Sequence, residues 1–260
     1  MVVVILVVKM VCMSNNKPWI HPPYDPDYYQ WLRDKKVNKP LRLVASTAGS
    51  IVCQVLHGRL ITEVPETTRH YKGRAVFSPV HRSGWDIPTT VAAVAKAGFE
   101  RPRPVSRHQN YPNRPVSWFM HSLGAGAVDR DNAKLKGIEL AFGEFLENNE
   151  TVEVFSEGTR IRSEARRVHD IAGTAIMLAA QHEGTAVIGI GMAGLADEDV
   201  KRPIGFGIPT VVTFAEPLEV PYANGSRRGA FATARKLTPV LFDVMQAAQD
   251  RAYQIRDACI

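Results

Sequence analysis

The sequence predicts one large α/β domain with a mixed, mostly parallel central sheet flanked by helices, preceded by an N-terminal helical membrane-associating segment. The chain has 260 residues, 45% of them hydrophobic, which is enough to bury a sizeable core. Short apolar runs that suit strands alternate with longer segments of helical periodicity. The apolar stretches before residue 58 do not follow this alternation of strands and helices. We therefore assign residues 1–57 to the N-terminal segment and 58–260 to the α/β domain.

The N-terminal segment contains two apolar stretches. Residues 1–12, "MVVVILVVKMVC", are too few to span a bilayer, which takes about 20 residues. A signal-peptide core, a mis-called start codon and a membrane-docked segment all remain open, although no small-residue cleavage site follows. Leu41–Leu56 reads as an apolar helix, which either lies on the bilayer or is buried in the core. The aromatic residues between these stretches suit a lipid interface or packing on the main domain.

Five strands and five helices are expected in the α/β domain. The predicted strands are Arg59–Val64, Arg74–Ser78, Thr151–Phe155, Ala186–Gly191 and Thr210–Phe214. The predicted helices are Ile87–Ala97, Val116–Leu123, Asn132–Glu147, Ile171–His182 and a long one from Arg227 to about Arg256. This order of elements favours a sheet with helices on both faces.

The amino-acid composition limits the classes of molecule that the protein is expected to bind. The formal net charge of +6 favours anionic partners, and we expect an anionic membrane surface or a phosphate-bearing substrate. Nucleic acid is not expected, because the basic residues are dispersed and no nucleic-acid-binding motif is present. The three cysteines have neither metal nor disulfide spacing, which is typical of a reduced cytosolic chain. The eight histidines do not cluster, so no metal site is expected.

The stretch "SPVHRSGWD", Ser78–Asp86, follows a predicted strand and contains a histidine and an aspartate five residues apart. Histidine is suited to accept a proton near neutral pH, and a carboxylate on its other ring nitrogen fixes the tautomer. The alternative is a helix-start turn in which Ser83 or Asp86 caps the helix. No G-x-S-x-G nucleophile motif occurs, so His81 and Asp86, if catalytic, activate a substrate hydroxyl.

Two further strand ends carry polar residues. In "VEVFSEGTRIR", Val152–Arg162, the guanidinium of Arg160 suits a phosphate, and Glu157 either holds that arginine or bonds a substrate hydroxyl. A structural Glu–Arg pair in a tight turn is the alternative. In "GAGAVDRDN", Gly124–Asn132, Arg130 follows a short apolar run and by itself reads as a surface arginine.

Together and in this order, these segments resemble the 1-acylglycerol-3-phosphate acyltransferase family of glycerolipid acyltransferases over roughly residues 58–221. The family motifs are matched by His81 and Asp86, by Gly124, Ala127, Val128 and Arg130, and by Phe155, Glu157, Gly158, Thr159 and Arg160. The apolar run Ala186–Ile190 and the stretch Val211–Pro221 resemble later family strands.

The resemblance implies a role for each matched residue. His81 would be the general base and Asp86 its orienting carboxylate. The acceptor phosphate would be held by Arg130 and Arg160, with Glu157, Gly158 and Thr159 forming the acceptor-binding turn. The acyl donor would be acyl-CoA or an acyl-carrier protein, with no cofactor. The product from a lysophosphatidic acid-like acceptor would be phosphatidic acid, made for phospholipid synthesis at the cytoplasmic face of the membrane by a peripheral or monotopic protein.

Several positions depart from the family pattern. Val80 stands in place of the usual Asn, Ser156 in place of Pro, and Asp170-Ile171 in place of Phe-Lys. One expected cation is therefore missing, and Arg166, Arg167 or His169 are candidates to replace it. Two alternatives follow: a glycerol-3-phosphate or other lysophospholipid acyltransferase, since "HRS" is typical of the former, and a non-catalytic lipid-surface binding protein.

Overall fold

The computed structural model describes residues 38–44, 47, 59–107, 110–111, 114–128, 142–161, 166–195 and 209–260. Most of the predicted membrane-associating segment, residues 1–57, lies outside the described residues, as does Arg130. Of the predicted helix Leu41–Leu56, residues 41–44 and 47 are helical. No helix among the described residues is both long enough and apolar enough to cross a membrane.

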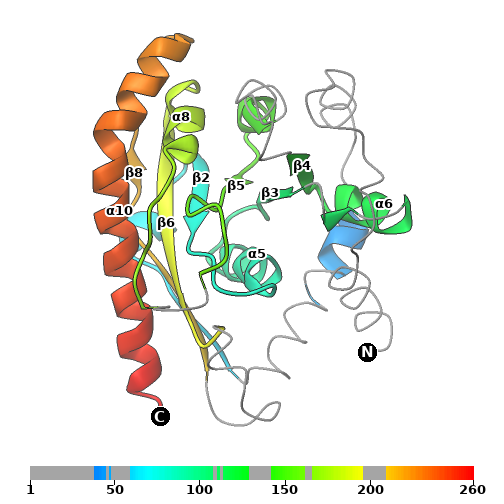
Figure 1. Ribbon diagram of the computed structural model, residues 1–260. Helices are drawn as coiled ribbons and strands as arrows, with labels where there is room; N and C mark the ends of the chain where they lie inside the picture. The colour runs from blue at the N-terminus through cyan, green and yellow to red at the C-terminus, as the bar shows by residue number, and fades with distance from the viewer. Residues whose placement is uncertain are drawn as a thin grey trace.

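The described strands form one mixed sheet (Figure 1). They are β1 Leu60–Glu63, β2 Arg74–Pro79, β3 Arg103–Arg107, β4 Gly126–Val128, β5 Val152–Glu153, β6 Thr185–Ala193, β7 Thr210–Phe214 and β8 Leu218–Glu219. The order is β1-β7-β6-β2-β5-β3-β4, and β8 pairs with β6. Only the β6 pairings with β7 and β8 are antiparallel, so among the described strands the predicted mixed, mostly parallel sheet is confirmed.

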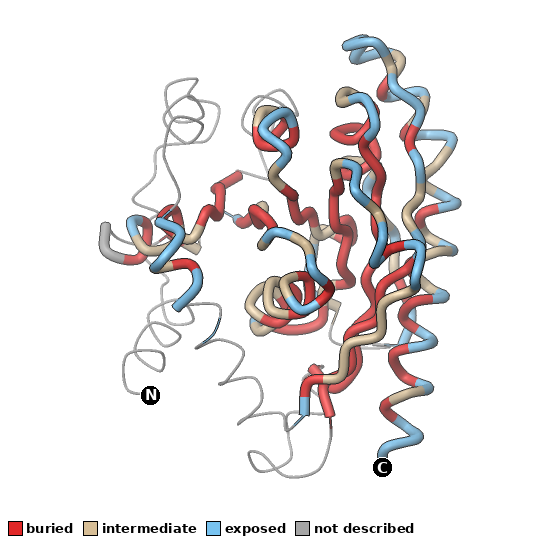
Figure 2. The backbone as a smooth tube through the Cα atoms, turned by 180° about the vertical axis from the view of Figure 1, so that it is seen from behind, coloured by how far each residue is buried: buried red, intermediate tan, exposed pale blue. Residues whose placement is uncertain are grey.

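Helices lie on both sides of this sheet (Figure 1). They are α4 Glu66–Arg69, α5 Asp86–Lys96, α6 Arg114–Ser122, the helical residues 142–147, α8 Thr174–Ala180 and α10 Arg227–Asp257. The long α10 packs on β6, β7 and α8, and α5 lies on the opposite side of the sheet. Figure 2 shows the result: the central strands are buried, and α10 alternates between buried and exposed residues along its length.

The five predicted strands are present, and three described strands were not predicted. The β3 strand was not predicted because Pro104 interrupts the apolar–polar alternation of its residues, and proline lacks the N–H that a strand interior needs. The β4 and β8 strands have only three and two residues, too few for an alternating pattern. Their place in the sheet depends on neighbours distant in sequence.

The packing of α10 against β6 depends on a glycine. A Cβ on Gly191 would lie 2.3 Å from the carbonyl carbon of Ala248, so only glycine lets the helix approach this closely. There Gln249 accepts a hydrogen bond from the N–H of Met192 at 2.7 Å and donates one to its carbonyl at 2.9 Å. This side chain bonds backbone groups of β6 past the point where the pairing with β2 ends, while β7 still pairs with Met192 through Val212.

The described N-terminal residues lie against the domain near α6. The N–H of Asn38 donates to the carbonyl of Ser122 at 3.2 Å. The buried guanidinium of Arg42 donates to the carbonyls of Arg101 and Pro102, and burial together with Arg103 lowers its pKa to about 10. Leu43 and Val44, on the same helical segment, are exposed.

Candidate active site

The predicted catalytic stretch begins where β2 ends, at the carboxyl end of the parallel strands. The β2 strand closes at Pro79, and the N–H of Val80 still donates to the carbonyl of Ile190 on β6. The chain then leaves the sheet and turns into α5 through His81–Trp85. Loops at the carboxyl ends of parallel strands are where α/β proteins place their functional groups.

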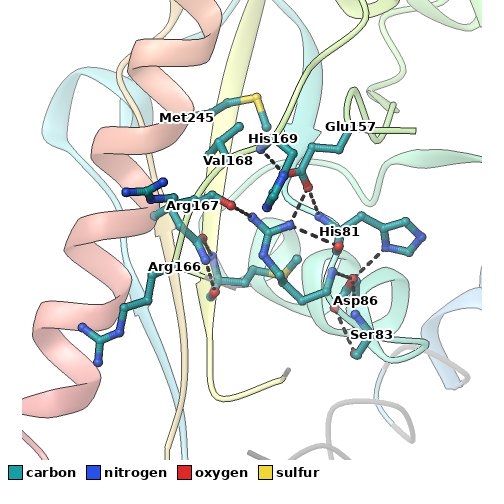
Figure 3. A network of polar contacts seen from close by, with 12 residues as sticks. His81, Ser83, Asp86, Glu157, Arg166, Arg167, Val168, His169 and Met245 are labelled. Carbon is teal, nitrogen blue, oxygen red and sulfur yellow. Dashed lines mark hydrogen bonds and ion pairs between the residues drawn. The ribbon is translucent and has the colours of Figure 1, made fainter. Parts of the chain in front are cut away.

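His81 and Asp86 are in direct contact. The Nδ1 atom of His81 lies 2.8 Å from Oδ2 of Asp86, and the imidazole is 21% exposed whereas the carboxylate is fully buried. An ionised carboxylate only accepts hydrogen bonds, so this contact assigns the proton to Nδ1 and leaves Nε2 as the basic nitrogen. The Nε2 atom has no hydrogen-bond partner among the described residues, and Figure 3 shows the ring projecting away from the polar cluster behind it.

Asp86 is the first residue of α5, yet its side chain turns back onto the preceding turn. Its Oδ2 accepts from the N–H groups of Arg82 at 2.5 Å and Ser83 at 2.8 Å, and its Oδ1 accepts from the Ser83 hydroxyl at 3.0 Å. Trp85 is the residue before the helix and makes no side-chain capping bond. The aspartate therefore rigidifies the turn that carries His81.

The ring of Phe155 restrains the other side of the imidazole. The two ring centroids lie 4.6 Å apart with the planes tilted by 44°. With Asp86 bonded at Nδ1 and Phe155 against the ring, the direction in which Nε2 points is defined by packing as well as by the hydrogen bond.

Glu157 joins the third sequence motif to the first. Its Oε2 accepts from the backbone N–H of His81 at 2.7 Å and from Nη1 of Arg82 at 2.6 Å. Its Oε1 accepts from the N–H of His169 at 3.0 Å. All of these bonds are within the protein, and the Glu157 side chain is fully buried (Figure 3). The sequence left open a structural Glu157–Arg160 pair within the turn, whereas the structure pairs Glu157 with Arg82, a residue distant in sequence.

Arg82 is the residue at this site whose importance sequence reasoning missed. Its side chain is 1% exposed and donates to Glu157, to the carbonyl of His81 at 3.1 Å and to the carbonyl of Arg167 at 2.7 Å. The available signal was its place directly after His81, but arginines are common at protein surfaces, and nothing in the sequence predicts a buried ion pair over 75 positions.

The segment that receives Arg82 is held by α10. Gln246 accepts from the N–H of Val168 at 2.8 Å and donates to the carbonyl of Arg166 at 3.0 Å. Arg166, a candidate for the missing cation, is engaged with Asp257 at 2.8 Å and lies over the ring of Tyr253. Arg167 is exposed, and its guanidinium points toward α10 in Figure 3. His169 has a buried Nε2 that no described residue hydrogen-bonds.

The other predicted site residues form an exposed turn beside His81. Gly158 has φ 67°, a left-handed conformation that favours glycine, and the N–H of Thr159 bonds the carbonyl of Glu157 at 2.8 Å. Arg160 is exposed, and its Nη1 lies 3.6 Å from where a Cβ on Gly84 would be. The N–H of Ile161 donates to the carbonyl of His81 at 2.8 Å, which keeps this turn beside the histidine. Arg130 lies outside the described residues.

A His–carboxylate pair beside an exposed arginine, at the carboxyl ends of a mostly parallel sheet, is suited to proton transfer with a bound anionic substrate. The family model described as acyltransferase matches residues 59–193, more than half of the chain. The chain therefore belongs to the acyltransferase family, which confirms the family predicted from its motifs.

Among solved structures, the fold is similar to that of the 1-acyl-sn-glycerophosphate (LPA) acyltransferase PlsC from Thermotoga maritima. The TM-score is 0.60, the sequence identity is 16%, and the similarity covers 96% of this chain and 92% of that chain. At this identity the likeness establishes the fold. A search of curated proteins finds no match.

Proposed function

We propose that this acyltransferase moves a fatty acyl group from an acyl thioester to the free hydroxyl of a 1-acylglycerol-3-phosphate-like acceptor, giving phosphatidic acid. The observation that carries the proposal is the His81–Asp86 contact of 2.8 Å, together with an Nε2 of His81 that has no hydrogen-bond partner in the described part of the chain. Acyl-CoA or an acyl-carrier protein would be the co-substrate, and the reaction would need no cofactor.

The proposed reaction is a direct transfer without an acyl-enzyme. Nε2 of His81 takes the proton of the acceptor hydroxyl as its oxygen attacks the thioester carbonyl carbon. Asp86 stabilises the resulting imidazolium through Nδ1. The tetrahedral intermediate collapses as the carbon–sulfur bond breaks, and the imidazolium returns its proton to the departing thiolate. The products are the acylated acceptor and a free thiol.

An anionic acceptor is supported by the position of Arg160. Its exposed guanidinium lies over Gly84, in the turn between the two catalytic candidates. Guanidinium groups bind phosphate oxygens in pairs of parallel hydrogen bonds. In this proposal Gly158 and Thr159 shape the turn that presents Arg160, Glu157 maintains that turn through Arg82, and Arg130 supplies a second cation.

Work at a membrane surface is the second element of the proposal. The acceptor and product are lipids, and a chain of net charge +6 is attracted to anionic bilayers. The exposed Leu43 and Val44, in the helical residues that precede the α/β domain, are suited to contact with acyl chains.

A thiol-release assay with an acyl thioester and lysophosphatidic acid tests the mechanism. His81→Ala and Asp86→Asn should each lower kcat at least about a hundredfold, because proton transfer by a positioned base contributes that much. The matched control is His70→Ala, since His70 is an exposed histidine paired with Glu66 at 3.8 Å. Retention of wild-type turnover by His81→Ala would contradict the mechanism.

The acceptor is tested separately by mass spectrometry. Lysophosphatidic acid, glycerol 3-phosphate and lysophospholipids with a head group are each offered with acyl-CoA and with an acyl-carrier protein. We expect the lysophosphatidic acid reaction to have the highest kcat/KM. Preference for glycerol 3-phosphate would replace the proposed acceptor, and salt-sensitive liposome binding without thioester consumption would favour a lipid-binding protein.

A further inference from the structure

Glu153 is an acidic residue in the interior of the sheet. It lies on β5 between β2 and β3, and it is fully buried. Its register partner on β2 is Phe77. Side chains alternate along a strand, so Val152 and Val154 point to the opposite face. An apolar residue at this position would avoid the cost of removing a carboxyl from water, so Glu153 departs from the pattern of its own strand.

The carboxyl of Glu153 meets the start of α5 through Thr90. The Thr90 hydroxyl oxygen lies 2.6 Å from Oε1 of Glu153, 2.9 Å from the carbonyl of Asp86 and 3.1 Å from the carbonyl of Ile87. A hydroxyl donates one proton, and both carbonyls only accept. If Glu153 is ionised, Thr90 must donate to it and has no proton for Asp86. If Glu153 is protonated, it donates to Thr90, and Thr90 donates to the carbonyl of Asp86.

The second oxygen of Glu153 favours the protonated form. Oε2 is buried and has no hydrogen-bond partner among the residues that the structure describes. A charged oxygen in that position would lose its hydration without compensation, whereas the carbonyl oxygen of a neutral acid loses much less. Consistent with this, burial raises the pKa of Glu153 to about 8, the Thr90 hydrogen bond opposes the rise, and the negative charge of Asp86 adds to it.

The charged residues on the adjoining elements are engaged elsewhere or exposed. On β2, Arg74 bonds the carbonyl of Glu183. On β3, Arg103 pairs with Glu150, and Arg107 is exposed. On α5, Lys96 bonds the carbonyl of Leu60. Arg82, in the turn between β2 and α5, pairs with Glu157. Within the described part of the chain, Asp86 is therefore the charged residue whose electrostatic repulsion raises the pKa of Glu153.

We infer that Glu153 is a positioning residue: as a neutral acid it holds the Asp86 carbonyl through Thr90, and its ionisation sets the alkaline limit of activity. This inference rests on the proposed roles of His81 and Asp86. On ionisation the Thr90 hydroxyl turns to the carboxylate, and a second negative charge arises near Asp86. Both changes loosen the first turn of α5, which carries the carboxylate that orients His81.

The substitution Glu153→Gln isolates the ionisation. A carboxamide stays neutral at every pH, and its NH₂ group can donate to Thr90 as the protonated acid does. Wild-type kcat should fall as pH rises through the pKa of Glu153, approaching about tenfold per pH unit, whereas the kcat of Glu153→Gln should stay level. Glu216→Gln, at an exposed glutamate, is the matched control and should keep the wild-type profile. An identical alkaline fall in wild type and Glu153→Gln would overturn the inference.

Two measurements report on Glu153 without activity. Infrared difference spectra between wild type and Glu153→Gln at pH 7 should contain the carbonyl stretch of a protonated carboxyl, and its absence would overturn the inference. The unfolded chain releases this proton near the ordinary glutamate pKa, whereas the folded protein keeps it up to about pH 8. Wild type should therefore lose stability relative to Glu153→Gln between these pH values.

The two proposals can fail separately. A wild-type protein that releases no thiol with any acceptor would remove the proposed function, and the infrared band would still decide the protonation of Glu153. If Glu153→Gln does not fold, the loss of the infrared band with rising pH in wild type, compared with the loss of kcat, replaces the variant. A band that persists where kcat has fallen would contradict the inference.

Discussion

The ion pair between Arg82 and Glu157 allows a quantitative test of how the site is held together. The substitution Arg82→Met keeps much of the side-chain volume and removes the charge and every hydrogen bond of the guanidinium. Because the side chains are 1% and 0% exposed, water does not replace the lost partner. Removing one member of a buried pair typically costs 3–5 kcal/mol, and two carbonyls lose a donor as well, so we expect about 4 kcal/mol of destabilisation.

The buried negative charge of Glu157, left without its cation, is the main source of the destabilisation expected for Arg82→Met. Glu157 keeps the N–H groups of His81 and His169 as donors, but it loses the guanidinium of Arg82. Adding Glu157→Gln to Arg82→Met removes that charge. The double variant should therefore be destabilised by clearly less than the sum of the two single variants, which is the signature of direct coupling.

Urea unfolding measures the free energy of unfolding of wild type, the two single variants and the double variant, and thiol release measures their turnover. Arg251→Met is the matched control, because Arg251 also pairs with a glutamate, Glu63, but these two side chains are 54% and 39% exposed. Its urea midpoint should not move. A stability of Arg82→Met within ~1 kcal/mol of wild type, or strict additivity in the double variant, would refute this account of the site.

Two further outcomes are expected. Arg160→Ala should raise the KM for a phosphate-bearing acceptor about tenfold or more with little change in kcat, because charge-assisted bonds to phosphate contribute to binding; Arg235→Ala, at an exposed arginine of α10, is the control. An unchanged acceptor KM in Arg160→Ala would show that this arginine does not bind the acceptor. Gly191→Ala should lower the melting temperature through a loss of at least about 1–3 kcal/mol, since its Cβ would meet the Ala248 carbonyl carbon at 2.3 Å. Gly84→Ala should be tolerated, because the nearest described atom beyond its chain neighbours is Nη1 of Arg160 at 3.6 Å, and equal stability of these two variants would contradict the packing described for α10.

Sequence patterns predicted the long and regular elements of this fold. The 31-residue helix α10 and the buried strand β6 carry strong periodicity or strong apolar character over many residues, so local preferences agree with the tertiary structure. The β3 and β4 strands are short, and β3 contains Pro104, so their extended conformation depends on pairing with β5 and with each other. Local sequence does not specify such pairing.

The candidate site likewise contains one contact that the sequence predicted and one that it did not. His81 and Asp86 are five residues apart, and a single turn between a strand and a helix brings them together, so their contact could be predicted from sequence. The partner of Glu157 could not, because Arg160 is near in sequence whereas Arg82 is near in space.

The sequence by itself determined the alternation of strands and helices, the family to which the chain belongs, and the local pairing of His81 with Asp86. Only the tertiary structure decided that Arg82 pairs with Glu157, that Gln246 of α10 bonds the backbone of residues 166–168, and that Glu153 bonds Thr90 in the first turns of α5. The physical reason is distance along the chain. These contacts join residues 63 to 80 positions apart, so they form only when the sheet and its covering helices bring those segments together. The Arg82–Glu157 and Thr90–Glu153 contacts are also buried away from water.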